Sequence, residues 1–169
     1  KGGALREGTA HAEGDYIAFC DADLDLAPEQ LADFIDRMQR ENADVVIGSK
    51  MHPESKVDYP AIRRVYSWGY YILLLLLFRL NVRDTQTGLK LFKAEVIKPV
   101  MRQILVKRFA FDIEVLAIIN ARGYKIISAP IEVVFHRVSF GRIGFRDIRN
   151  MFIDTLAIFY RLHILHYYD

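Results

Sequence analysis

Residues 14–26 have the sequence GDYIAFCDADLDL, and this stretch decides the fold of the chain. Its first part, residues 16–20, is a short apolar run rich in aromatic and β-branched residues, which predicts a buried strand of a parallel sheet. Three carboxylates follow at alternate positions. Because ligands gather at the carboxyl ends of strands in open α/β sheets, these acids are expected to point into a site.

The three acids are Asp21, Asp23 and Asp25. Carboxylates this close repel one another unless a cation lies between them. Hard oxygen donors suit Mg²⁺ or Mn²⁺, which keep several waters and take substrate phosphates as further ligands. The pattern therefore predicts a metal–diphosphate site with these three residues as the candidate metal ligands.

Other interpretations of the acidic stretch are open. It can be a polar loop that ends a strand, with Asp25 opening the next helix. A dehalogenase-type phosphatase also carries two such acids after an apolar strand, with Asp21 as its nucleophile, but favours a small hydroxyl or branched residue where Asp25 stands. An EF-hand is a poor match, because Leu26 stands where that loop needs Gly and Ala32 stands where it needs Glu.

Length and composition indicate one α/β domain or most of one. The chain has 169 residues, 52% of them hydrophobic, and a net charge of +2, which gives no indication of nucleic-acid binding. Basic residues cluster at 63–64 and 137–149. The single cysteine, Cys20, is expected to be a small core residue, and it excludes an intramolecular disulfide framework.

Periodicity and turn residues predict the order of the elements. The order of strand, helix and strand between residues 16 and 49 predicts a right-handed βαβ unit in a mostly parallel sheet flanked by helices. A parallel α/β domain normally has strands before the abrupt opening at Lys1, so we expect an N-terminal portion to be missing. We expect helices over 3–13, 31–38, 61–80, 95–105, 109–121 (ended by Gly123) and from 145 to the end, and strands over 43–49, 125–130 and 131–136.

Two helices are candidates for a membrane surface. The helix over 61–80 is apolar all round but too short for a bilayer span, so a core helix and a membrane-facing helix are equally expected. The C-terminal helix can cover the sheet or lie in a membrane interface. We expect residues 1–140 to form the main domain and residues 141–169 an amphipathic interfacial or docking helix. The helix has the apolar stripe Ile148, Phe152, Leu156, Phe159 and Leu162, with Arg142, Arg146 and Arg149 at its start.

A series of short segments forms a pattern by its order and spacing. The segments are KGGALREG (1–8), DAD (21–23), IGSK (47–50), Arg63 with Ser67, DTQTGLK (84–90), FDIE (111–114), PIE (130–132) and Arg137. In this order and spacing they resemble the polyprenyl-phosphate glycosyltransferases of the dolichol-phosphate mannose synthase type, over essentially the whole chain. These enzymes belong to the inverting glycosyltransferase family 2 and have the GT-A (Rossmann-like) fold.

The sequence departs from this family at three points. No segment matches the proline–tyrosine–asparagine–glutamate strand that helps to hold the nucleotide, so no residue here is assigned to the base or ribose. Asp25 stands where many members have glutamine. Lys50 stands where many have arginine, which replaces a bidentate fork by a point charge.

The resemblance implies transfer of a sugar from a GDP- or UDP-sugar to the phosphate of a polyprenol. It implies a peripheral or tail-associated protein at the cytoplasmic face of a membrane. Asp23 is the implied main ligand of Mg²⁺ or Mn²⁺, with Asp21 and Asp25 assisting. The nucleophile is a phosphate oxygen, already ionised near neutral pH, so cationic groups that position the acceptor matter more than a strong general base.

The remaining site residues are also assigned through the resemblance. Arg63, Ser67 and Arg137 are the candidates for the acceptor phosphate. The candidate substrate-binding set is Lys50, Arg63, Ser67, Gln86, Gly88 and Arg137, and the candidate catalytic set is Asp23, Asp84, Asp112 and Glu114.

Several of these assignments have alternatives. Gly88 can allow a close backbone approach or simply make a turn, and Glu114 can be an ordinary acid at a helix N-terminus. A family 2 transferase with a non-lipid acceptor and a truncated, non-catalytic domain that binds a membrane or a partner are the alternative functions.

Overall fold

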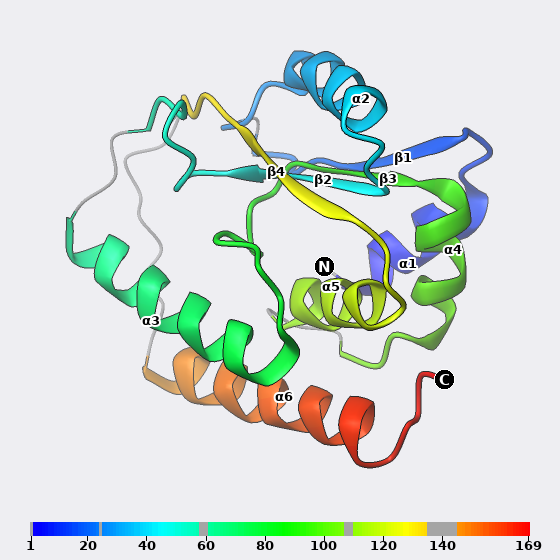
Figure 1. Ribbon diagram of the computed structural model, residues 1–169, viewed down its shortest axis with the longest axis vertical. Coiled ribbons are helices and arrows are strands. Elements are labelled where there is room, and N and C mark those ends of the chain that lie inside the picture. Colours follow the sequence, from blue (N-terminus) through cyan, green and yellow to red (C-terminus); the bar gives the residue numbers. More distant parts are fainter. Residues whose placement is uncertain (1, 24, 58–60, 107–109, 135–144) are drawn as a thin grey trace.

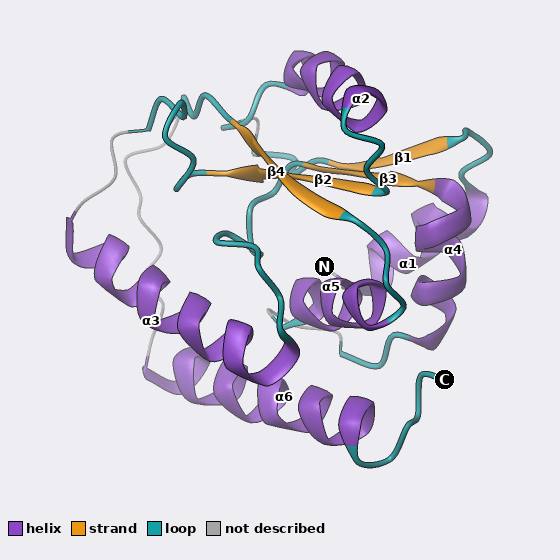
Figure 2. Ribbon diagram, in the orientation of Figure 1, coloured by secondary structure: helices purple, strands orange, loops and turns teal. Residues whose placement is uncertain are grey.

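A computed structural model describes residues 2–23, 25–57, 61–106, 110–134 and 145–169, with the backbone alone at 61–66 and 145–147. A four-stranded sheet separates helix α2 (Leu31–Arg40) from the other helices (Figures 1 and 2). Below the sheet lie α1 (Gly2–His11), α4 (Ala94–Gln103) and α5 (Phe111–Ala121). Helices α3 (Ala61–Phe78) and α6 (Phe145–His163) form an outer layer beneath α5.

The sheet is mixed, and three of its four strands run in the same direction. The strand order is β1 (Tyr16–Phe19), β3 (Lys90–Lys93), β2 (Val45–Ser49) and β4 (Ile126–Pro130). Strand β3 pairs antiparallel with both β1 and β2, whereas β2 and β4 pair in parallel. The predicted mostly parallel sheet is confirmed, because β1, β2 and β4 share one direction. However, the antiparallel strand β3 lies between β1 and β2, which were expected to be neighbours in a βαβ unit.

Strand β1 is half-exposed, which corrects the prediction of a fully buried strand. Ile17 and Phe19 are buried in the core, and the alternate residues Tyr16 and Ala18 are exposed. The strand is the end strand of the described sheet, so its side chains alternate between a covered and an open face. Cys20 continues the open face and is exposed, so its prediction as a core residue was wrong.

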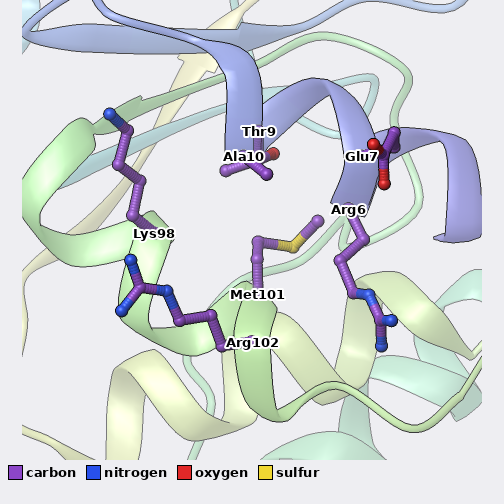
Figure 3. Close-up of a pocket in the computed structure, with 7 residues that line it drawn as sticks. All are labelled: Arg6, Glu7, Thr9, Ala10, Lys98, Met101 and Arg102. Atoms are coloured by element: carbon purple, nitrogen blue, oxygen red, sulfur yellow. The ribbon is translucent and has the colours of Figure 1, made fainter.

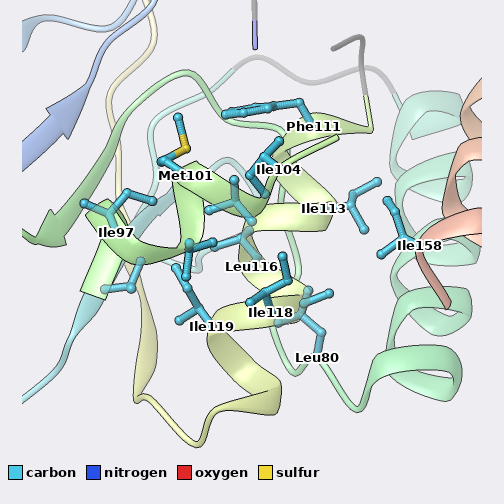
Figure 4. Close-up of a cluster of buried hydrophobic side chains, with 14 of the residues drawn as sticks. Leu80, Ile97, Met101, Ile104, Phe111, Ile113, Leu116, Ile118, Ile119 and Ile158 are labelled. Carbon is cyan, nitrogen blue, oxygen red and sulfur yellow. The ribbon is translucent and has the colours of Figure 1, made fainter. Parts of the chain in front are cut away.

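Helix α5 forms the centre of the larger core cluster (Figure 4). All nine residues from Phe111 to Ile119 are buried, because α4, α3 and α6 surround this helix. Asp112 and Glu114 are therefore carried into the interior with the apolar residues. A second, smaller cluster between the sheet and α2 contains Phe34 and Met38, two residues of the predicted amphipathic face.

Helices α3 and α6 lie side by side and run in the same direction. The Tyr70 hydroxyl lies 3.0 Å from the Thr155 hydroxyl, and burial raises the pKa of Tyr70 to about 12, against the opposing effect of that hydrogen bond. Further along, the Phe78 ring lies 6.3 Å from the rings of both Phe159 and His163. The two helices thus form one layer (Figure 1).

The predicted helix and strand limits agree closely with the structure except near the C-terminal end. Gly123 has φ of +80°, which confirms the left-handed cap after α5. Residues 132 and 133 form isolated bridges to Lys56 and Leu26 rather than a strand, and α6 ends at His163 rather than at the last residue. The predicted boundary at 140/141 lies outside the described residues and stays a prediction. None of the helices described here has the length and apolar character needed to cross a bilayer.

Candidate active site

Three acids follow β1 and form its acidic tip: Asp21, Asp23 and Asp25. This tip meets the polar turn before β3, which consists of residues 84–88 (DTQTG). A Cβ atom placed on Gly88 would lie 2.6 Å from Cγ and 2.8 Å from Cβ of Asp21. Real Cβ atoms essentially never come this close to another carbon, so any larger residue at this position would force the turn or the Asp21 side chain to shift. The expected close backbone approach at Gly88 is therefore present, and its neighbour is the first acid of the predicted metal site.

The other two acids are arranged as a local turn. The backbone N–H of Asp25 donates to Oδ1 of Asp23 at 3.3 Å, and Asp23 is exposed while Asp21 and Asp25 are half-buried. Burial raises the pKa of the Cys20 thiol, and the negative charges of Asp21 and Asp23 raise it further. The tip of β1 is thus a region of negative potential, as a cation site requires.

Within the described part of the chain, no three His, Cys, Asp or Glu side chains converge as a ready-made metal cage. Mg²⁺ and Mn²⁺ do not need one, because they are commonly held by one or two carboxylates, waters and substrate phosphates. The exposed carboxylate of Asp23, with Asp21 beside it, fits this kind of site.

Asp84 joins the polar turn to the end of β2. Its Oδ2 accepts a hydrogen bond from the backbone N–H of Lys50 at 3.1 Å. This contact places the candidate residues Asp84 and Lys50 side by side at the same sheet edge as Asp21 and Gly88. The structure thus places these four candidate residues at one end of the sheet, and their roles stay predictions.

Lys90 is a buried cation that holds the polar turn in place, and the sequence did not single it out. Its Nζ donates to Asp112 Oδ1 at 2.7 Å and to the Thr87 carbonyl at 2.5 Å, and its side chain is only 2% exposed. Asp112 is thereby engaged in a buried ion pair directly beneath the turn. A lysine inside the apolar run Leu89–Phe92 is the signal that could have identified it, because buried charges are paired.

Glu114 is fully buried and joins three segments. It accepts hydrogen bonds from the backbone N–H groups of Leu105 and Val106 at 3.0 and 2.7 Å. The Tyr168 hydroxyl donates to its other oxygen, and Arg161 of α6 lies 3.3 Å away. Burial and the neighbouring carboxylate raise the pKa of Tyr168. These contacts describe a carboxylate that anchors the C-terminal segment.

The remaining predicted residues lie elsewhere or outside the described residues. Gln86 is exposed, and its amide donates to the sulfur of Met151 on α6 at 3.0 Å. Ser67 is half-buried on α3, and the backbone of Arg63 lies one turn before it on the same helix. Arg137 falls outside the described residues, so its predicted role stays a prediction.

Two cavities differ in their relation to this site. One, of about 350 Å³, lies between α1 and α4, with Lys98 and Arg102 on one side (Figure 3). It is remote from the acidic tip, because α4 begins at the opposite end of β3. The other, of about 290 Å³, is lined by residues that flank Lys50 and Asp84, among them Ser49 and Arg83. The second cavity therefore extends the candidate site.

The chain is similar to characterised transferases in sequence. It is 31% identical to the dolichyl-phosphate beta-glucosyltransferase ALG5D of Trichomonas vaginalis, over 97% of this chain and 52% of that protein. It is 30% identical to the dolichyl-phosphate beta-glucosyltransferase of Saccharomyces cerevisiae, over 78% of this chain and 43% of that protein. It is 28% identical to the glycosyltransferase AglD of Haloferax volcanii, over 78% of this chain and 21% of that protein. The chain thus spans about half the length of the first two relatives.

Solved structures show the same fold at lower identity. Glucosyl-3-phosphoglycerate synthase of Mycobacterium tuberculosis, in complex with Mn²⁺, UDP-glucose and phosphoglyceric acid, matches 95% of this chain and 53% of its own, with a TM-score of 0.62 and 17% identity. The sequence model of the family described as "Glycosyl transferase family 2" matches residues 1–101, which is more than half of the 169 residues. The chain therefore belongs to glycosyl transferase family 2.

Proposed function

We propose that this chain is the catalytic part of a transferase that moves a sugar from a nucleotide diphosphate to the phosphate of a polyprenol at a membrane surface. The observation that carries the proposal is the meeting of the acidic tip of β1 with the polar turn and the end of β2, through Asp21 against Gly88 and Asp84 on Lys50. Family membership supports transferase chemistry and leaves the phosphatase alternative without support.

The donor diphosphate is proposed to bind at the tip of β1. Asp23, with Asp21 and Asp25 assisting directly or through water, would hold Mn²⁺ or Mg²⁺. The structural neighbour glucosyl-3-phosphoglycerate synthase binds Mn²⁺ together with UDP-glucose in one complex and together with UDP in another. A divalent ion bound there would neutralise the negative charge that develops on the leaving diphosphate. The ammonium group of Lys50, which follows β2 at the same end of the sheet, would supply a further positive charge.

The acceptor phosphate is proposed to act as the nucleophile without a strong base from the protein. One of its ionised oxygens forms the new bond to the anomeric carbon, while the bond from that carbon to the diphosphate breaks and its electron pair leaves with the diphosphate. Asp112 and Glu114 are both engaged in buried ion pairs, which makes them positioning residues in this proposal. The chain then needs to bind, orient and shield the two phosphates.

A lipid acceptor is favoured by two helices with uncovered apolar stripes. Leu76 of α3 is 76% exposed, and the predicted stripe of α6 divides: Phe159 and Leu162 pack inward, whereas its first half stays outside. Large exposed apolar surfaces are typical of protein or membrane contact sites. The exposed residues are Trp68, Ile72, Leu75 and Leu76 on α3, and Ile148, Phe152, Ile153, Leu156 and Tyr160 on α6.

We therefore propose peripheral membrane association through these two helices, on the cytoplasmic face. The relatives named dolichyl-phosphate beta-glucosyltransferase support a polyprenyl phosphate acceptor. A soluble acceptor is the second candidate, because the structural neighbour is a glucosyl-3-phosphoglycerate synthase. Under that alternative, removing the apolar side chains of α6 would leave transfer unchanged.

A transfer assay tests the proposal. The chain is incubated with Mn²⁺, polyprenyl phosphate in vesicles and radiolabelled UDP-glucose or GDP-mannose, and label entering the organic phase is counted. We expect transfer that is lost in Asp23→Asn and kept in the matched control Asp36→Asn, an exposed acid on α2. Label that stays in water with a folded chain, or that enters the lipid equally well with Asp23→Asn, would refute the proposal.

A further inference from the structure

We propose that the cavity beside Lys50 and Asp84 receives the phosphate of the acceptor, and that Arg83 is the residue that recognises its charge. This inference rests on the proposed function and adds a residue and a subsite to it. The cavity measures about 290 Å³, slightly smaller than typical pockets for drug-sized ligands. It suits a phosphate headgroup with its first carbons better than a whole nucleotide sugar.

Arg83 is held in place by an aromatic residue of α3. Its guanidinium carbon lies 5.7 Å from the centroid of the Trp68 ring, within the range of a cation–π contact. The segment before it is docked on the same helix, because the Tyr71 hydroxyl donates to Oδ1 of Asn81 at 2.9 Å. Trp68 and Tyr71 themselves pack edge to face. The guanidinium is thus pre-organised at the wall of the cavity.

The charge balance of the cavity favours an anion. Its lining contains Arg83 and no carboxylate, and no acid among the described residues forms an ion pair with this arginine. His52 and Ser49 add donors. His52 Nδ1 accepts from the backbone N–H of Glu54 at 3.2 Å, so the neutral ring carries its proton on Nε2. Ser49 Oγ accepts from the Met51 N–H, which leaves its hydroxyl proton to donate.

The position of the cavity identifies the acceptor rather than the donor as its occupant. The donor diphosphate is proposed to bind at the acidic tip of β1, which is an outermost strand of the described sheet. Strand β3 separates β1 from β2. The cavity lies at the β2–β4 side, with Ser128 of β4 in its wall. Trp68 belongs to the exposed stripe of α3, so a lipid chain on that stripe would bring its phosphate to Arg83.

The test uses Trp68, the only tryptophan of the chain, as a built-in reporter. The chain is titrated with citronellyl phosphate, citronellol, inorganic phosphate and UDP while tryptophan emission is recorded. In parallel, KM for the acceptor and for the nucleotide sugar is measured for wild type, Arg83→Ala, Arg83→Lys and the control Arg102→Ala on α4. Thermal unfolding of each variant checks that the fold is intact.

We expect saturable quenching or enhancement by citronellyl phosphate and none by citronellol. Arg83→Ala is expected to raise the acceptor KM by about 10- to 100-fold, the effect of losing charge-assisted hydrogen bonds, with the donor KM within about twofold. Arg83→Lys should fall between, because lysine keeps the charge but loses the planar fork. Arg102→Ala should behave as wild type.

Four results separate the possible failures. Transfer with an unchanged acceptor KM in Arg83→Ala, or with equal changes in both KM values, overturns the inference and leaves the proposed function standing. Inorganic phosphate that binds as tightly as citronellyl phosphate overturns the acceptor assignment in favour of a free-phosphate site. No emission change with any probe overturns it as well. Citronellyl phosphate binding that depends on Arg83 without any sugar transfer supports the subsite and refutes the proposed function.

Discussion

Replacing Gly88 by alanine tests whether the acidic tip and the polar turn must touch. Carbon atoms pack at about 3.5–4.0 Å, whereas the added methyl group would lie 2.6 Å from Cγ of Asp21. Either the turn or the carboxylate must therefore move by about 1 Å. Overpacking of this kind costs about 1–3 kcal/mol of unfolding free energy, and a 1 Å displacement of a reacting group can cost about 100-fold in rate.

We expect Gly88→Ala to lose about two orders of magnitude in sugar transfer and about 1–3 kcal/mol of stability. The control is Gly8→Ala on α1, where an added Cβ meets nothing within 4 Å. That substitution should stabilise the helix by about 0.5–1 kcal/mol and leave transfer unchanged. Transfer rates and urea denaturation measure both effects.

A double-mutant cycle shows whether the effect passes through Asp21. Asp21→Gly removes all three side-chain atoms that the new methyl group would meet, so the stability cost of Gly88→Ala should largely disappear in that background. A coupling of about 1 kcal/mol or more is the expected result. Additive costs, or a Gly88→Ala variant with wild-type transfer and stability, would refute the reasoning that the two groups must be in contact.

Two further predictions concern buried and half-buried carboxylates. Glu114→Gln should lower the unfolding free energy by about 3 kcal/mol, because it removes the fully buried charge that pairs with the partly buried Arg161. An unchanged urea midpoint with lost transfer would instead make Glu114 a catalytic base. Asp44 has a lowered pKa because hydrogen bonds from Lys93 and the Lys125 N–H outweigh the effect of burial. Its contribution to stability is therefore complete above the ordinary value of 3.8 and is lost as the pH falls through the lowered pKa. Asp44→Asn should cost about 0.5–1 kcal/mol at pH 7, and this cost should shrink as the pH falls through the lowered pKa. A cost that stays the same, or grows, as the solution is acidified would contradict this sign.

The sequence predicts the fold well wherever local periodicity determines the element. Helix α2 has a repeating apolar pattern, and α5 and β2 are continuous apolar runs; all three lie where the sequence predicts them. The direction of β3 is different, because its four residues carry no local signal that they pair antiparallel between β1 and β2. The exposure of Cys20 follows from the place of β1 in the sheet, which is also a non-local property.

In the candidate site, too, the sequence predicts which residues are polar and where they lie, but not their long-range contacts. Asp21 contacts Gly88, and Asp84 contacts Lys50, at the same end of the sheet, although these residues are far apart in the sequence. Residue type alone does not reveal that Glu114 anchors the C-terminal segment, because its partners are as far as 54 residues away in the sequence. Gln86 lies in the predicted motif DTQTGLK, but its exposed side chain contacts Met151 of α6. Long-range partners therefore decide the role of each acid.

Mn²⁺ binding in the presence of a nucleoside diphosphate tests the proposed metal site at the tip of β1 most directly. The carboxylates at the tip of β1 are proposed to bind a divalent ion together with the leaving diphosphate. Paramagnetic resonance of free Mn²⁺, titrated with the chain and UDP or GDP, is predicted to show one bound ion for wild type and Asp36→Asn and none for Asp23→Asn. Equal binding by Asp23→Asn, or sugar transfer by a wild-type chain that binds no Mn²⁺ or Mg²⁺, would contradict the account.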